Sequence, residues 1–409
     1  MKIKINGGII TAVAMWGSMY VNYWLGLFSI FIPKLTLIQL IFVIDIISVI
    51  AIVVNLLKQK LVLSKSQIYT LLIAIIIVIS YYVTYLLYDY ENKAYKTYGM
   101  VLVSQTIVTT LLALFIANSE RAQYRIKSSV PYISVLFCFA AIYNTLFAEG
   151  TMGGGWINND NGMNYQVISY LAAFSTVFAE YYILENANVE WTQFFKKRIG
   201  KIICLFILMV NVFTVFIAGG RGGLVLILLS TIYTMFVLIN RDRTNKKAII
   251  RNVAIIFLLP FVLVGIILMA SNSSIKFSGI KRLLDIKFFF SDNGRSLLRN
   301  RAISIFNNKP MFGHGLGSDF FEIGTWSHNL FTDLLIEGGV CGLICFVSIT
   351  ILGICISFRL IQNDSTNRIW WMIFAMGFIM SMFSGYYLSN TMLALSITVW
   401  INSYTNVTK

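Results

Sequence analysis

His328 is one of only two histidines in this 409-residue sequence, and it stands directly before a long apolar segment. An imidazole ordinarily titrates near about pH 6.5, so it can take a proton from a hydroxyl group at neutral pH. His328 is therefore the first candidate for a general base. The other histidine, His314, lies in the glycine-rich "GHGLGS", where we expect a less rigidly held side chain.

Arginines form the second group of candidates. Arg221 lies between two glycine pairs in "IAGGRGGLVL", where two apolar segments meet. An arginine close to a membrane is costly and indicates function, and the glycines leave backbone amides accessible to an anion. The alternative is a snorkelling arginine in a tight hairpin. Arg295, Arg299 and Arg301 follow in a basic stretch, and their guanidinium groups suit phosphate oxygens, although they also fit a solvated helix face.

Acidic residues are few, and two of them lie inside the apolar segment after His328. Asp333 and Glu337 are four residues apart and share one helix face, whereas Glu337 lies about 180° around the helix from His328. We expect Glu337 to be a buried structural acid. Gly338, Gly339 and Gly342 are expected to allow close helix packing. Asp89 and Glu91 in "LYDYENK" form a possible divalent-metal site, but two acids in a short loop are more typical of solvated charge.

The elements that position these residues are transmembrane helices. The composition is 58% hydrophobic and 12% charged, against about 25% charged residues in a soluble domain. Apolar runs of about 20 residues recur along the sequence, which predicts an all-α polytopic membrane protein with about twelve spans. The predicted spans are 9–32, 35–57, 68–88, 101–118, 131–148, 165–185, 202–219, 222–240, 253–271, 328–357, 370–387 and 391–403.

The distribution of lysine and arginine predicts the orientation. With a cytoplasmic N-terminus most of them fall in cytoplasmic loops, whereas the short outer loops hold Lys34, Lys93, Lys96 and Arg221. Both termini are then cytoplasmic, and the net charge of +15 mainly reflects orientation, so we expect no nucleic-acid partner. We predict one integral membrane domain, 1–409, with a long outer loop, 272–327, between the ninth and tenth spans.

Short helices are expected within this outer loop. Residues 275–290 alternate apolar and basic side chains, which is typical of a helix lying on the membrane lipids. A second helix is predicted over 295–306, and Pro310 with the following glycines would end it in a turn.

Three segments together resemble the O-antigen ligase and O-antigen polymerase superfamily of bacterial surface-polysaccharide enzymes. They are "GGRGGL" (219–224), "NGRSLLRNRAISIFNNKPMFGHGLGS" (293–318) and "SHNLFTDLLIEGGVCGL" (327–343), and "INNDNGMNY" (157–165) is a weaker fourth. Singly these motifs are short, but their order and membrane side are specific. The family's turn of proline, two hydrophobic residues, glycine, any residue and glycine falls on 310–315. His314 stands at the unspecified position of this pattern and inherits no role.

The resemblance implies a membrane glycosyltransferase with a GT-C-like fold at the outer face of the bacterial cytoplasmic (inner) membrane. Its donor would be an oligosaccharide linked to undecaprenyl pyrophosphate, and it would polymerise repeat units of O-antigen, capsule or exopolysaccharide with inversion. A flippase and a chain-length regulator are expected as partners. We expect no cofactor and no metal, because the sequence has only two histidines and the outer loops hold no dense carboxylate cluster. The implied catalytic residues are Arg221, Arg295 and His328, and the candidate substrate-binding residues are Arg299, Arg301, Asn329 and Asn161.

Three alternatives also fit the sequence. A ligase would use the same donor but transfer finished glycan to a different acceptor, such as lipid A-core. A metal-dependent transferase would use Asp89 and Glu91. A flippase for lipid-linked oligosaccharides also fits twelve spans, although transporters commonly place their polar sites near the membrane midplane rather than at one face.

Overall fold

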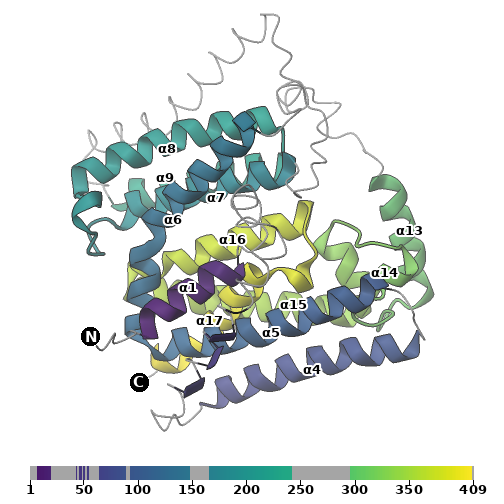
Figure 1. The fold of residues 1–409 in the computed structure, drawn as a ribbon. Helices are drawn as coiled ribbons and strands as arrows, with labels where there is room; N and C mark the ends of the chain where they lie inside the picture. Colours follow the sequence, from purple (N-terminus) through teal and green to yellow (C-terminus); the bar gives the residue numbers. More distant parts are fainter. Residues whose placement is uncertain are drawn as a thin grey trace, which may run out of the picture. The chain divides into compact units, whose positions relative to one another are not determined.

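The computed structural model describes residues 7–19, 43, 46, 47, 49, 50, 53, 54, 64–88, 93–147, 165–241 and 295–407. Within these ranges every regular element is a helix (Figure 1). Six of the described helices are long and apolar enough to cross a membrane: Gln67–Leu87, Glu120–Thr145, Tyr165–Glu185, Lys197–Ala218, Arg221–Arg241 and Leu330–Asn363. The predicted all-α polytopic class is confirmed, whereas the twelve spans and the GT-C-like fold stay predictions.

The described helices follow the predicted spans closely. The spans predicted at 253–271, over 20–32 of the first span and over most of 35–57 lie outside the described residues, as does the predicted interfacial helix 275–290. The helix predicted over 295–306 is confirmed as α13 (Arg295–Asn308). The other α-helices are α1 (Gly7–Met19), α4 (Lys65–Leu87), α5 (Lys93–Asn118), α6 (Glu120–Phe147), α7 (Tyr165–Glu185), α8 (Lys197–Ala218), α9 (Arg221–Arg241), α14 (Asp319–Glu322), α15 (Leu330–Asn363), α16 (Arg368–Phe383) and α17 (Thr391–Val407).

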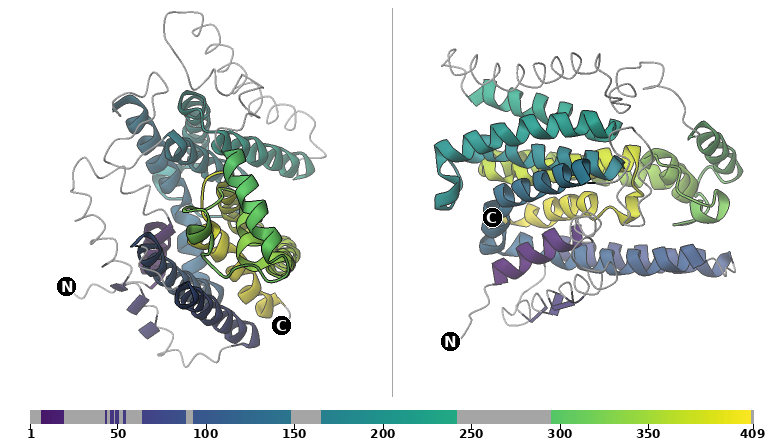
Figure 2. Two further views of the ribbon diagram at one scale, coloured as in Figure 1. Left: turned by 90° about the vertical axis from the view of Figure 1, so that its right-hand side faces the viewer. Right: turned by 45° about the horizontal axis from the view of Figure 1, so that its top comes forward.

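The chain forms two compact units: one from 1–19, 41–126 and 292–409, the other from 20–40 and 127–291. In the first unit α17 packs against α5, α15 and α16, and α13 packs against α15. The green α13 lies beside one end of α15 (Figure 2). In the second unit α7 packs against both α8 and α9 and is almost entirely buried. The prediction of one integral domain with a loop at 272–327 stays a prediction.

Helix α15 is broken at Gly339, where the backbone takes φ 60° and ψ −160°. A break of this kind leaves helical N–H and C=O groups without their usual partners, which is tolerated in a membrane span only where other protein groups replace them. The turn 310–315 replaces them here, with four backbone hydrogen bonds. They are His314 N to Ile336 O (2.8 Å), Gly315 N to Glu337 O (2.8 Å), Val340 N to Pro310 O (2.8 Å) and Cys341 N to Met311 O (3.0 Å).

The pairing of the turn with the broken helix explains why glycines occur in both segments. A Cβ at Gly313 would lie 2.5 Å from the backbone carbon and oxygen of Glu337, and a Cβ at Gly339 would lie 2.5 Å from those of Met311. The expectation that Gly338, Gly339 and Gly342 serve helix packing is therefore wrong for Gly339, which has the conformation of a helix break. It also finds no support at Gly338, where nothing lies within 4 Å of an added Cβ.

We expect Gly339→Ala to destabilise the protein and Gly338→Ala to be tolerated. The backbone at Gly339 (φ 60°, ψ −160°) lies in a region that is essentially confined to glycine and costs an alanine about 1–3 kcal/mol. Forcing a methyl group against a packed backbone costs about 1–3 kcal/mol more. Gly338 has an ordinary φ and open space around it. Thermal unfolding of the two variants in detergent measures the difference. Equal unfolding temperatures would contradict this account of the break.

Candidate functional site at the head of α15

His328 has an unusual backbone conformation. It is the one non-glycine residue with a positive φ, +60°, among the residues that the structure describes. This region costs an L-residue with a Cβ about 1–2 kcal/mol and is tolerated where the surroundings impose it, which is most common at functional sites. The residue with this costly conformation is the same histidine whose position before an apolar segment made it a candidate base.

The ring of His328 is oriented by a backbone carbonyl. Its Nδ1 lies 3.3 Å from the oxygen of Ser384, which also accepts a hydrogen bond from Trp326 Nε1 at 3.2 Å. A carbonyl oxygen can only accept, so Nδ1 carries a proton and a neutral His328 has its lone pair on Nε2. The rings of Trp326 and His328 meet edge to face, with 5.1 Å between their centroids. The half-buried His328 is thus held in one tautomer.

Asn329 caps the helix that His328 precedes. Its side-chain oxygen accepts hydrogen bonds from the N–H groups of Phe331 (3.0 Å) and Thr332 (3.3 Å), as an N-cap residue does. The carboxylate of Asp333 accepts a hydrogen bond from Ser327 N at 2.8 Å and so holds the preceding turn. Asn329 therefore has a structural role here, and its predicted contact with substrate stays a prediction.

The glycines around Arg221 fit closely against α7 in the second unit. Helix α8 ends at Gly219, which has φ 73°, and α9 begins at Arg221. A Cβ at Gly222 would lie 2.0 Å from the hydroxyl oxygen of Tyr170, and a Cβ at Gly223 would lie 2.2 Å from the Oγ of Ser169. The glycine pattern is therefore explained by helix packing, which places the half-buried Arg221 at the start of α9.

Helix α13 carries the other candidate arginines. Its buried Ala302 and Ile305 pack against Ile323 and Ile336, which fixes α13 against the first part of α15. Arg299 and Arg301 are exposed. Arg295 is the first residue of the helix, but its side chain and the whole of Asn161 lie outside the description. Their predicted roles stay predictions.

Residues 204–347 match the family model for O-Antigen ligase. The matched segment contains Arg221, Arg295 and His328, so it confirms the resemblance predicted from the three motifs. No curated protein and no solved structure matches the chain. The match and the apolar helices together point to a bacterial membrane protein in which residues 204–347 resemble O-antigen ligases.

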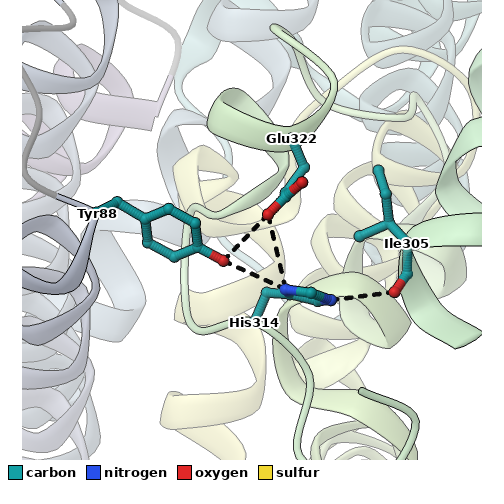
Figure 3. Close-up of polar contacts among 4 residues, drawn as sticks. All are labelled: Tyr88, Ile305, His314 and Glu322. Carbon is teal, nitrogen blue, oxygen red and sulfur yellow. Dashed lines mark hydrogen bonds and ion pairs between the residues drawn. The ribbon is translucent and has the colours of Figure 1, made fainter. Parts of the chain in front are cut away.

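His314, to which the resemblance gave no role, anchors the turn 310–315 to two helices (Figure 3). Its Nε2 lies 3.0 Å from the backbone oxygen of Ile305 in α13, and its Nδ1 lies 3.2 Å from the hydroxyl of Tyr88 at the end of α4. Glu322 completes the group, 3.7 Å from Nδ1, and accepts a hydrogen bond from Tyr88 at 3.2 Å. No sequence pattern marked this group, because Tyr88 lies 226 residues before His314.

Glu337 and Asp319 are two buried acids in the first unit. Glu337 accepts hydrogen bonds from the hydroxyls of Tyr386 and Tyr387, which confirms the expected buried structural acid. Burial, and then the negative charge of Glu337, raise the pKa of Asp319 well above its ordinary value. Burial therefore favours the neutral form of Asp319. No sequence pattern had marked Tyr386, Tyr387 or Asp319.

The first unit thus brings together His328, α13 and the break in α15, whose backbone groups bind the turn 310–315. Arg221 belongs to the second unit, so its predicted meeting with Arg295 and His328 stays a prediction. No cluster of three metal-binding side chains occurs in the searched, described part of the chain. Asp89 and Glu91 lie outside it, so the metal-dependent alternative is not tested.

Proposed function

We propose that the protein is a membrane glycosyltransferase that polymerises oligosaccharide repeat units linked to undecaprenyl pyrophosphate. The observation that carries this proposal is His328, which has a positive φ and an imidazole oriented by a backbone carbonyl. It lies just before α15, inside the segment that matches O-Antigen ligase. The reaction takes place at the outer face of the bacterial cytoplasmic membrane, and the product is O-antigen, capsule or exopolysaccharide. A flippase would supply the donor, and a chain-length regulator would act on the product.

The proposed chemistry uses few groups. The sugar pyrophosphate already contains a good leaving group, so the protein mainly positions it and stabilises the charge that develops as the bond breaks. Arg221 and Arg295 bind the pyrophosphate oxygens, and Arg299 and Arg301 add positive charge. The Nε2 of His328 takes the proton of the acceptor hydroxyl while its oxygen attacks the anomeric carbon. The carbon–oxygen bond to pyrophosphate breaks, and the pyrophosphate leaves with the bonding electrons, which inverts the anomeric centre.

A ligase is the second candidate, because the family that residues 204–347 match is described as O-Antigen ligase. The two activities use the same donor. A polymerase transfers the growing chain to the next lipid-linked repeat unit, whereas a ligase transfers finished glycan to another acceptor such as lipid A-core.

Incubating the purified protein in nanodiscs with its lipid-linked repeat unit alone separates the candidates. We expect a ladder of products, absent with His328→Ala and unchanged in rate by EDTA. Transfer that appears only after a second acceptor is added would assign a ligase. No transfer under either condition would contradict the proposal. Activity lost in EDTA and restored by Mg²⁺ or Mn²⁺ would instead favour a metal-dependent reaction that involves Asp89 and Glu91.

A further inference from the structure

The buried carboxylate of Glu337 gathers donors from two other parts of the chain. Its Oε1 accepts hydrogen bonds from the N–H of Gly317, at 2.9 Å, and from the hydroxyl of Tyr386. Its Oε2 accepts a hydrogen bond from the hydroxyl of Tyr387. Gly317 lies just after the turn 310–315, and the tyrosines follow α16. Because every one of these groups donates, they suit an ionised carboxylate, which accepts only.

The segment that Glu337 holds also carries the acceptor for His328. Ser384 lies two residues before Tyr386, and its carbonyl oxygen is the one that binds His328 Nδ1 and Trp326 Nε1. The ring of Tyr386 packs 6.4 Å from that of Trp326, which in turn lies 5.1 Å from the ring of His328. Glu337 is therefore connected to the candidate base in two ways: through the backbone of the segment that contains Ser384 and Tyr386, and through the packed rings of Tyr386 and Trp326.

We propose that Glu337 is a positioning residue for His328. It fixes the segment 384–387 through Tyr386 and Tyr387, and the Ser384 carbonyl then keeps the proton of His328 on Nδ1 and the lone pair on Nε2. The inference rests on the proposed function, in which Nε2 takes the proton of the acceptor hydroxyl. The hydrogen bond made by one ring nitrogen of histidine decides which tautomer the other presents. Glu337 itself does not touch the reacting atoms.

The geometry explains why an acid is needed here. A glutamine at position 337 would replace one acceptor oxygen with an NH₂ group, so one of the three donors would lose its partner. A buried polar group left without a partner is costly, and the tyrosine segment is expected to shift until that group is satisfied. Ser384 moves with it, because it lies in the same short connection between α16 and α17.

Histidine-labelled protein provides a direct test, because the sequence contains only His314 and His328. Magic-angle-spinning NMR of ¹³C,¹⁵N-histidine protein in nanodiscs, with His314→Asn to assign the signals, reports the tautomer of each neutral ring. We expect His328 to be protonated at Nδ1 in the wild type. In Glu337→Gln, and in the double variant Tyr386→Phe/Tyr387→Phe, we expect a mixture of both tautomers.

Glu180→Gln is the matched control. Glu180 is also a fully buried acid that accepts hydrogen bonds from hydroxyl groups, those of Thr231 (2.7 Å) and Thr234 (3.4 Å), but it lies in the second unit. It should leave the His328 signals unchanged. We expect kcat to fall about 10-fold in Glu337→Gln with KM for the donor unchanged, which is less than the loss of a general base. The control should keep both kinetic constants.

The outcomes separate the two proposals. An unchanged Nδ1–H tautomer in the variants would overturn the positioning role, even if His328→Ala were inactive. A changed tautomer together with an active His328→Ala would support the positioning role and contradict the proposed function. If Glu337→Gln does not fold, the double tyrosine variant, which keeps the acid, decides the question by the same signals.

Discussion

Replacing His328 with alanine is expected to lower the transfer rate about 10²–10⁴-fold, the usual contribution of general-base assistance. The variant should still fold and bind the donor, because the arginines assigned to the pyrophosphate lie elsewhere in the chain. Single-turnover transfer from a labelled lipid-linked donor measures the rate, and a separate donor-binding titration measures affinity. A rate within a few-fold of the wild type would contradict the assignment.

His328→Gly is the control that separates chemistry from backbone strain. Glycine adopts the φ of +60° at little steric cost, whereas alanine pays about 1–2 kcal/mol for it. Both variants lack the imidazole, so both should be inactive to the same degree. His328→Gly should nevertheless unfold at a higher temperature than His328→Ala.

Changing Arg221 or Arg295 to lysine is expected to lower kcat/KM about 10–100-fold. Charge-assisted hydrogen bonds of this kind contribute about 1.5–3 kcal/mol each, and each 1.36 kcal/mol is a factor of about ten in rate. Lysine keeps the charge but loses the forked donor geometry that matches two phosphate oxygens. Steady-state kinetics with the lipid-linked donor measures the loss. Full activity in both lysine variants would rule out pyrophosphate binding by these residues.

Arg241→Lys is the matched control for Arg221. Both arginines belong to α9, but Arg241 is at the opposite end, where it donates a hydrogen bond to the backbone oxygen of Leu184 at 3.0 Å. A lysine there retains one donor for that carbonyl. Its kcat/KM should equal that of the wild type, so a similar loss in both variants would indicate general damage to α9.

Local patterns in the sequence were sufficient to predict most of the described helices. The apolar run that predicted a span at 165–185 has the same ends as α7, because polar and charged segments flank it on both sides. The helix predicted over 295–306 is α13, whose end at Asn308 lies just before Pro310. The start of a helix just after His328 can also be predicted from the sequence, because Asn329 is a typical N-cap residue.

The contacts that orient His328 could not be predicted in the same way. The break at Gly339 depends on backbone hydrogen bonds to residues 310–315, and such pairing leaves no periodic signal in either segment. The Ser384 carbonyl lies 56 residues from His328 in sequence, and any residue type supplies a carbonyl. Tyr386 and Tyr387 looked like ordinary residues at a helix end until their hydroxyls were seen to bind Glu337.

The transfer rate of the wild type as a function of pH tests the role of His328 most directly. A base must be neutral to accept a proton, so the single-turnover rate should fall as the pH is lowered through the pKa of that base. Donor binding, measured in parallel, should change less over the same range. If His328 instead bound the pyrophosphate as a cation, function would be lost as the pH rises. A rate that peaks in acid, together with retained activity in His328→Arg, would contradict the assignment of His328 as the base.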